Sequence, residues 1–265
     1  MNEVRQRGGG DPGRITTTVD NGIMLIGIDR PAKYNGFSPK MFQELGAAYS
    51  AYEKDDAARC AVLYAEGDHF TAGLDLSLVD PQAELFPLSE VDPLSLRQPK
   101  RTKPVVAAVH GICFTIGIEL MLASDITVAA ADTRFSQLEV KRGLVAFGGA
   151  PIRMVQSAGW GNAMRYLLTG DEFDAETALR FGWIQEIVAP GGQKDRAIAL
   201  ARSIAAQAPL AVKATIDASR MSVEQGPLAT VESDRARVDV LIKSEDFAEG
   251  VASFKERREP AYQGK

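Results

Sequence analysis

The stretch GICFTIGIELMLASD, residues 111–125, places one carboxylate inside an otherwise apolar run. Between Pro104 and Ala131 the only formal charges are those of Glu119 and Asp125. A buried carboxylate is unfavourable unless it is paired, hydrogen-bonded or protonated. Glu119 therefore needs either a structural partner or a task, and the rest of the sequence is interpreted around that question.

The residues around Glu119 predict a helix over 116–123 between two buried strands. The runs at 103–112 and 125–132 are continuously apolar, as in strands that are covered on both faces. We expect Thr115 to be the N-cap, with an extended backbone. The N–H of Ile116 would then have no partner within the helix. Such a helix start favours negative charge.

Two interpretations of Glu119 remain open on these residues alone. In one, an acid or base stands next to an oxyanion donor, which suits carbonyl chemistry through an enolate-like state. In the other, Glu119 is a satisfied buried glutamate that accepts hydrogen bonds from neighbouring backbone.

Further from Glu119, strands and helices alternate up to about residue 190, which predicts an α/β fold. Residues 14–31 read as two strands joined by a turn at Asp20-Asn21-Gly22. Ser38-Pro39 starts a helix, and CAVLYAEG from Cys60 is another buried strand. We expect a flexible leader at 1–14, a core at 15–192 with a loop over 76–99, and a helical region at 193–265.

Composition excludes several classes of protein. The 265 residues carry a net charge of −5, which argues against nucleic acid or an anionic membrane as a partner. No apolar run reaches the length of a membrane span, and the N-terminus lacks the pattern of a secretory signal. Cys60 and Cys113 have no metal-ligand spacing, and they read as reduced core residues of a cytoplasmic protein. We expect no metal.

Two more stretches are informative only in combination. HFTAGLDL, residues 69–76, holds a glycine turn that can expose N–H groups. RFSQLEVKRGLVAFGGAP, residues 134–151, places Glu139 before a glycine-rich segment. Alone, the first is typical of an ordinary turn and the second of a solvated surface.

In this order and spacing the stretches resemble the crotonase family of enoyl-CoA hydratases and isomerases. The motifs that carry the resemblance are AGLD at 72–75, the run 103–111, Glu119-Leu120 with Ser124-Asp125, FSQLE ending at Glu139, GDEFDAETALRFGWIQEIV at 170–188, APLAVKATI at 208–216 and FKERREPAYQG at 254–264. The resemblance covers nearly the whole chain from about residue 15.

The resemblance implies a crotonase-like spiral of ββα units, with C-terminal helices that build homotrimers, often paired into hexamers. It implies a coenzyme A thioester as the substrate and no separate cofactor. The thioester oxygen would bind the N–H groups of Leu74 and Ile116, and the catalytic carboxylates would be Glu119 and Glu139. The other residues that we expect at the substrate are Lys33, Ala72, Gly73, Asp75, Leu76, Gly117 and Phe147.

Both glutamates are present, whereas family isomerases commonly keep only the second, so the resemblance favours an enoyl-CoA hydratase that converts a trans-2-enoyl-CoA to a 3-hydroxyacyl-CoA. The alternatives are a Δ3,Δ2-enoyl-CoA isomerase, and a CoA-thioester-binding trimer with little catalysis. Three departures from the family pattern bear on the site. Ile116 and Phe147 stand where smaller residues are usual, and Leu76-Ser77 lacks the lysine that many members place there.

Overall fold

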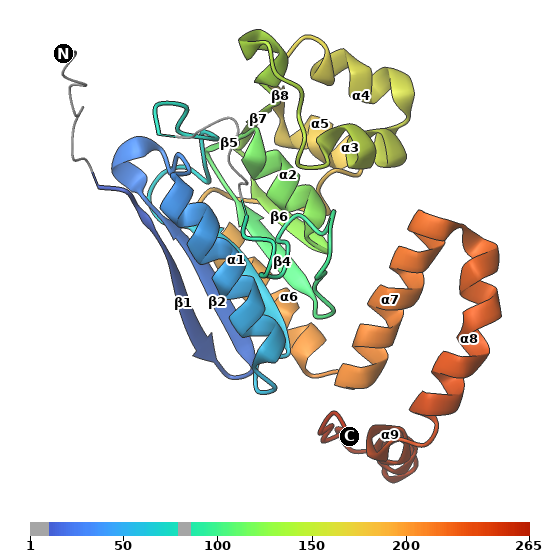
Figure 1. Cartoon of the computed structure of the whole chain (residues 1–265). Helices are drawn as coiled ribbons and strands as arrows, with labels where there is room; N and C mark the ends of the chain where they lie inside the picture. The colour runs from blue at the N-terminus through green and yellow to red at the C-terminus, as the bar shows by residue number, and fades with distance from the viewer. Residues whose placement is uncertain (1–10, 79–85) are drawn as a thin grey trace.

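The computed structural model describes residues 11–78 and 86–265 (Figure 1). The first ten residues of the predicted leader and residues 79–85 of the predicted loop lie outside this part. The strands are β1 (Arg14–Asp20), β2 (Ile23–Asp29), β3 (Cys60–Ala65), β4 (Val105–Val109), β5 (Ile112–Phe114), β6 (Ile126–Ala130), β7 (Arg134–Ser136), β8 (Phe173–Asp174) and β9 (Glu186–Val188).

The helices include two short 3-10 turns, η1 and η2. In chain order they are η1 (Pro31–Lys33), α1 (Pro39–Lys54), α2 (Ile116–Ala123), η2 (Glu139–Arg142), α3 (Ala150–Ala158), α4 (Trp160–Leu167), α5 (Ala175–Arg180), α6 (Gln193–Ala205), α7 (Pro209–Gln225), α8 (Pro227–Leu241) and α9 (Glu245–Glu256). The predicted start of α1 is confirmed, because the Ser38 hydroxyl accepts a hydrogen bond from the N–H of Met41.

A six-stranded sheet in the order β1-β2-β3-β4-β6-β9 forms the centre of the core. β1 and β2 make the predicted antiparallel hairpin, and the other neighbours are parallel. Alternate residues of β3 face opposite sides of this sheet. Ala61 and Leu63 pack in the cluster that holds α1, whereas Cys60 and Val62 pack against α6. The sheet is therefore covered on both faces, as the continuous apolar runs predict.

A second, three-stranded sheet, β5-β7-β8, brings the two glutamates together. β5 and β7 are parallel, with Phe114 opposite Ser136. Glu119 follows the end of β5 on α2, and Glu139 follows the end of β7 on η2. Because parallel strands end at the same edge of a sheet, both side chains reach one edge.

The predicted helical region from residue 193 is helical, but its first helix belongs to the core. Ala197, Ala201 and Ala205 of α6 pack on the six-stranded sheet. α7 and α8 contain no buried residue and project away from the sheet as a hairpin (Figure 1). α6 and α7 are separated at residues 206–208, because helical geometry is disfavoured for a residue that precedes a proline, here Ala208 before Pro209. Within the described residues, no helix is long and apolar enough to cross a membrane.

Candidate active site

An extended segment around Leu74 leaves one backbone donor free. On either side of Leu74, the carbonyl of Gly73 accepts from the N–H of Phe37, and the N–H of Asp75 donates to the carbonyl of Phe37. Successive groups of an extended chain point in opposite directions. The N–H of Leu74 therefore points away from Phe37, and it donates no hydrogen bond within residues 11–78 and 86–265.

The start of α2 leaves a second donor free. Ile116 is the first residue of this helix, so its N–H has no intrahelical acceptor. The residue before it is anchored, because the N–H of Thr115 donates to the carbonyl of Ser136 on β7. Leu74 and Ile116 line the same cavity, and in the described part of the chain the Ile116 N–H has no acceptor either. The two amides can therefore bind one oxygen atom.

Thr115 is the N-cap residue of α2, as predicted, but the extended backbone and the capping side chain that we expected are wrong. Its backbone is not extended but lies at φ 50°, ψ −114°, which is rare for a β-branched residue. Its side chain makes no cap, and its buried Oγ1 has no hydrogen-bond partner among the described residues. This Oγ1 packs closely on Gly73: a Cβ added to Gly73 would lie 2.2 Å from the Thr115 Oγ1. The strained backbone sits at the helix start that presents the Ile116 N–H.

Glu119 is buried, with 3% of its surface exposed, and it is held by the start of α3. Its Oε1 accepts a hydrogen bond of 3.3 Å from the N–H of Ala150. A Cβ on Gly148 would lie 2.2 Å from its Oε2, so only glycine leaves room for the carboxylate. Burial, assisted by the charge of Glu139, raises the pKa of Glu119 to about 7, although the Ala150 and Gly148 amides and Arg153 act to lower it.

Glu139 begins η2 and is partly buried. Burial raises the pKa of this carboxyl above its ordinary value. The hydrogen-bonding surroundings orient the side-chain amide of Gln137 so that its nitrogen donates to both Glu139 oxygens, at 3.1 and 3.2 Å. Gln137 is itself buried, so it holds the carboxylate in one orientation.

The two amides and the two carboxylates line a single cavity of about 210 Å³. Most of the remaining wall is apolar, and its polar members are the exposed Arg142 and the buried Thr115. The complete lining is Ala72, Leu74, Leu76, Thr115, Ile116, Glu119, Leu138, Glu139, Arg142, Leu144 and Phe147. This arrangement can polarise a carbonyl group and move protons beside it.

Seven of the eleven predicted site residues line this cavity, and four do not. Lys33 is exposed on η1. Gly73 and Asp75 flank Leu74 and shape the turn, where Asp75 pairs with Arg30 at 2.9 Å and binds Ser77. Gly117 faces the core, because a Cβ there would meet Thr71 and Cys113. These three shape the backbone and do not line the cavity.

Sequence reasoning missed three contributors to the site. Gln137 has a signal in its position two residues before Glu139, but buried amides in loops are hard to recognise. The glycine pair at 148–149 indicates that another group packs closely there, but the sequence does not show that at Gly148 this group is the Glu119 carboxylate. Arg142 reads as surface charge until η2 is seen to turn it toward the cavity.

Other polar clusters do not suggest a metal centre. Within residues 11–78 and 86–265, no three His, Cys, Asp or Glu side chains are arranged to hold a metal ion. Asp125 has a structural role at the start of the strand after α2, since it binds Arg101 with both oxygens, at 2.7 and 3.0 Å, and accepts from the N–H of Val105.

Comparison with known proteins decides the family. The model of the enoyl-CoA hydratase/isomerase family matches residues 18–265. The chain belongs to the enoyl-CoA hydratase/isomerase family. Its fold is the crotonase fold of solved members of the family. A probable enoyl-CoA hydratase/isomerase from Mycobacterium abscessus is 46% identical, with a TM-score of 0.92 over 95% of this chain and 98% of that one.

Curated relatives in the hydratase/isomerase family carry different activities in their names. The (E)-benzylidenesuccinyl-CoA hydratase of Thauera aromatica is 31% identical over 94% of this chain and 99% of its own length. The 1,2-epoxyphenylacetyl-CoA isomerase of Escherichia coli is 32% identical over 95% of this chain and 98% of its own length. Family membership therefore shows an enzyme of this superfamily, and the reaction must be argued from the site.

Proposed function

We propose that the protein is an enoyl-CoA hydratase, which adds water across the 2,3 double bond of a trans-2-enoyl-CoA. The observation that carries this proposal is the meeting of two free backbone N–H groups and two carboxylates in one cavity. Hydration needs all four groups: the amides stabilise charge on the thioester oxygen, and the carboxylates handle the two protons.

In the proposed reaction the thioester oxygen accepts hydrogen bonds from Leu74 and Ile116. Glu119 removes a proton from water as the oxygen of that water bonds to C3. The electrons of the double bond move toward the thioester, giving an enolate that the two amides stabilise. Glu139 then donates a proton to C2. A proton exchange between the two carboxyl groups restores the starting state, and no separate cofactor is required.

The environment of the carboxyl groups suits this exchange. A general acid or base works best when its pKa lies near the working pH. Burial brings the pKa of Glu119 to about 7 and also raises that of Glu139. Glu119 can therefore hold or release a proton at neutral pH, and burial makes the protonated form of Glu139 more accessible than it is in water.

A second candidate is a Δ3,Δ2-enoyl-CoA isomerase, in which Glu139 shuttles one proton. Two observations favour it. Two bulky residues, Phe147 and Ile116, line the cavity that would have to admit water, and one of the relatives described above is named as an isomerase. If the same residues close the site to water altogether, the chain is a CoA-thioester-binding protein with little catalysis.

The test follows the absorbance of the conjugated thioester after addition of crotonyl-CoA or longer 2-enoyl-CoAs. A hydratase removes that absorbance, and Glu119→Gln and Glu139→Gln should each lower the rate by about 10²-fold or more. A parallel assay with 3-enoyl-CoA detects isomerisation. If Glu119→Gln leaves hydration intact while Glu139→Gln abolishes isomerisation, the isomerase is the correct assignment.

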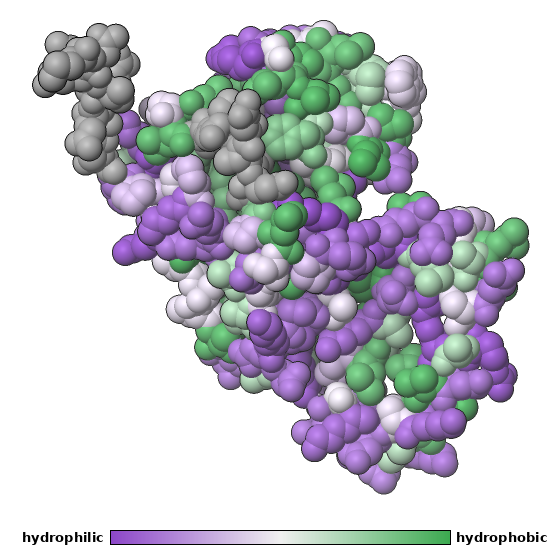
Figure 2. All heavy atoms as spheres, in the orientation of Figure 1, coloured by the Kyte–Doolittle hydropathy of each residue, from purple (hydrophilic) through white to green (hydrophobic). Residues whose placement is uncertain are grey.

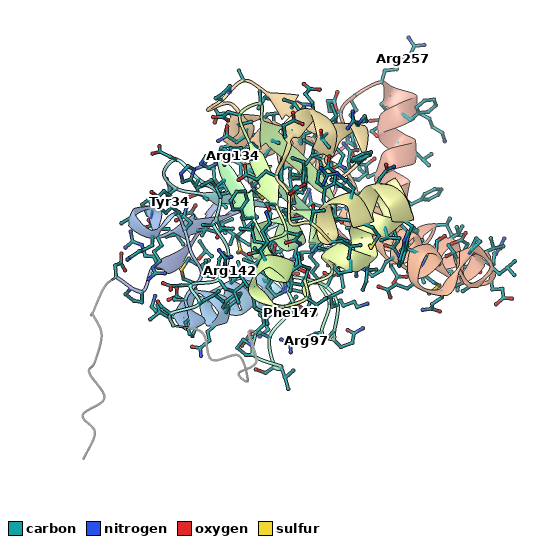
Figure 3. The ribbon with its side chains drawn as sticks, turned by 90° about the horizontal axis from the view of Figure 1, so that it is seen from above. Tyr34, Arg97, Arg134, Arg142, Phe147 and Arg257 are labelled. Carbon is teal, nitrogen blue, oxygen red and sulfur yellow. The ribbon has the colours of Figure 1, made fainter. Side chains whose placement is uncertain are left out.

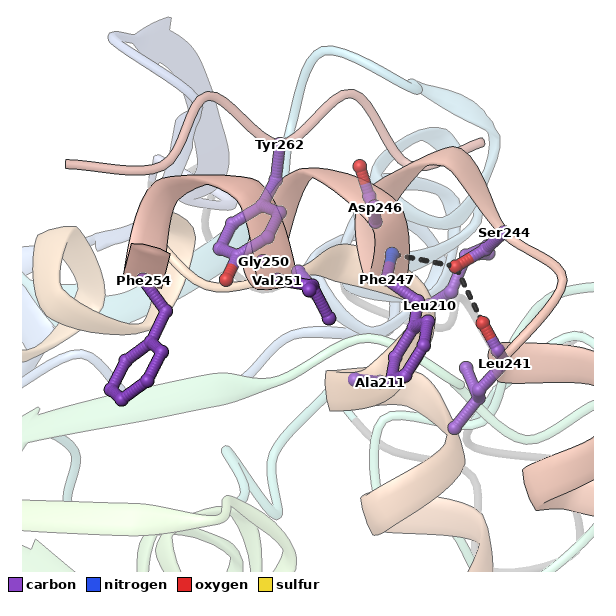
Figure 4. Close-up of a pocket in the computed structure, with 11 residues that line it drawn as sticks. Leu210, Ala211, Leu241, Ser244, Asp246, Phe247, Gly250, Val251, Phe254 and Tyr262 are labelled. Carbon is purple, nitrogen blue, oxygen red and sulfur yellow. Dashed lines mark hydrogen bonds between the residues drawn. The ribbon is translucent and has the colours of Figure 1, made fainter. Parts of the chain in front are cut away.

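We also propose that copies of the chain assemble through α7–α9 into a homotrimer or a pair of trimers. Support comes from a groove of about 470 Å³ between α7 and α9 (Figure 4). Its wall includes Phe247, Val251 and Phe254 of α9 and Leu210 and Ala211 of α7. Apolar surface of this kind marks an interface.

A further inference from the structure

One cation, Arg142, is among the eleven described residues that line the catalytic cavity. It ends η2, the 3-10 turn that Glu139 begins. Side chains three residues apart are aligned on a 3-10 helix. Arg142 therefore projects from the same side of η2 as Glu139, and Figure 3 shows it on the same side of the molecule as Phe147, another residue of the cavity wall.

The guanidinium of Arg142 is not committed to a carboxylate of the protein. Its hydrogen bond, 3.3 Å long, goes to the carbonyl of the adjacent Lys141, and the described ion pairs do not include it. The positive charge is thus available to a ligand.

The chain segment that carries Arg142 indicates which part of a ligand it meets. Leu138, Leu144 and Phe147, which lie close to Arg142 in the sequence, also line the cavity, and their apolar side chains suit an acyl chain. The donors for the thioester oxygen come from the other segments, at Leu74 and Ile116. An acyl chain that leaves the thioester site along this apolar wall reaches a cation.

We propose that Arg142 binds a carboxylate on the acyl group, so that the preferred substrate is the CoA monothioester of a short unsaturated dicarboxylic acid. This inference rests on the proposed hydratase function and names its substrate class. Arginine is suited to the role because its planar guanidinium binds a carboxylate with two hydrogen bonds. A cavity of about 210 Å³ is smaller than pockets for drug-sized ligands, which favours a short chain.

The test compares hydration of crotonyl-CoA with that of a six-carbon 2-enedioyl-CoA. The wild-type protein should favour the dicarboxylic thioester in kcat/KM. Arg142→Leu should lower the ratio of dicarboxylic to crotonyl kcat/KM by about 10–100-fold, mainly through KM, because a charge-assisted pair is lost. Lys141→Leu, which removes a neighbouring charge outside the cavity, should leave the ratio unchanged.

Two other outcomes would overturn the inference. If Arg142→Leu weakens both thioesters equally, and its effect vanishes with pantetheine thioesters, then the anion that Arg142 binds is a phosphate of CoA. If the ratio does not change at all, Arg142 binds no anion of the substrate.

Direct binding measurements distinguish a failure of the proposed hydratase function from a failure of the proposed role of Arg142. Calorimetry with a saturated dicarboxylic acyl-CoA and with butyryl-CoA needs no turnover. Preference for the dicarboxylic thioester that is lost in Arg142→Leu supports the inference even if neither enoyl-CoA is hydrated. Equal affinities in the wild-type protein contradict it.

Discussion

Glu119 is stabilised by neighbours that the apolar sequence around it does not reveal. The carboxylate accepts from the N–H of Ala150 and lies against Gly148, both at the start of α3. These contacts do not remove the effect of burial, because the pKa still rises to about 7. The sequence left two interpretations of Glu119 open. Its place in the cavity favours the role of an acid or base. The hydrogen bond from the Ala150 N–H agrees in part with the other interpretation, a buried glutamate held by the backbone.

The raised pKa of Glu119 predicts a pH-dependent stability. The folded protein holds a proton that the unfolded chain, with an ordinary pKa of 4.5, releases. The free energy of unfolding should therefore fall as pH rises from about 4.5 to about 7, by about 3 kcal/mol in total. Glu119→Gln should match the wild-type protein near pH 4.5 and exceed it above pH 7 in urea unfolding. Glu232→Gln, an exposed control on α8, should show no such divergence.

Gly148 offers a test that moves Glu119 without changing its chemistry. Its missing side chain leaves the space that the Glu119 carboxylate occupies, so Gly148→Ala must displace the carboxylate. We expect hydration to fall by about 10²-fold, the scale of a small misplacement of a catalytic group. Gly161→Ala on α4 is the matched control, because a Cβ there meets nothing within 4 Å. Equal activity of the two variants would show that Glu119 needs no fixed position.

Thr115 predicts a stabilising substitution. Its backbone strain costs about 1–3 kcal/mol, and glycine at the same φ removes that strain at an entropic cost of about 0.5–1 kcal/mol. Thr115→Gly should raise the free energy of unfolding by about 1 kcal/mol and keep hydration, because the Ile116 N–H is retained. Thr115→Val keeps the backbone strain but removes the unpartnered hydroxyl. Comparing the free energies of unfolding of the two variants therefore separates these two effects. A less stable Thr115→Gly protein would argue that the packing against Gly73 outweighs the strain.

At the scale of elements, the hydrophobic pattern of the sequence predicted the strands and helices whose positions depend on burial. The β1–β2 hairpin, the buried strands β3, β4 and β6, and the limits of α2 are confirmed. The conformation of Thr115 could not be predicted, because it results from the Ser136 carbonyl and Gly73 that fix it across the second sheet. The cavity wall depends on η2, a single turn without a hydrophobic period, so the orientation of Arg142 also remained hidden.

The loop between η2 and α3 predicts a limit on acyl length. Phe147 lines the cavity, and 55% of its surface is exposed, so its ring stands at the rim. Phe147→Gly should raise kcat/KM for long or bulky enoyl-CoAs relative to crotonyl-CoA, because the ring no longer occupies the path of the chain. A chain-length profile identical to that of the wild-type protein would remove Phe147 from the acyl path.

At the scale of the whole molecule, the chain has a packed core and a helical extension that lacks one. α6 completes the core, whereas α7 and α8 pack on each other without burying a residue. On the face in Figure 2, hydrophobic residues lie between hydrophilic ones over this extension. In proteins most of the stability of a helix comes from packing one of its faces against other elements. The extension therefore needs a covering surface, and this is the physical basis for the proposed assembly.

The assembly prediction turns on the groove between α7 and α9. Phe254 is 85% exposed and Phe247 is 49% exposed, both on the side of α9 that lines the groove. Light scattering of the wild-type protein should give the mass of three or six chains. Replacing both rings, as Phe247→Asp with Phe254→Asp, places charge on a surface that we expect to be buried between copies, so the mass should fall toward one chain. Val19→Asp, an exposed apolar residue on β1, should leave the mass unchanged. A wild-type mass of one chain at micromolar concentration would show that the extension is stable without a partner.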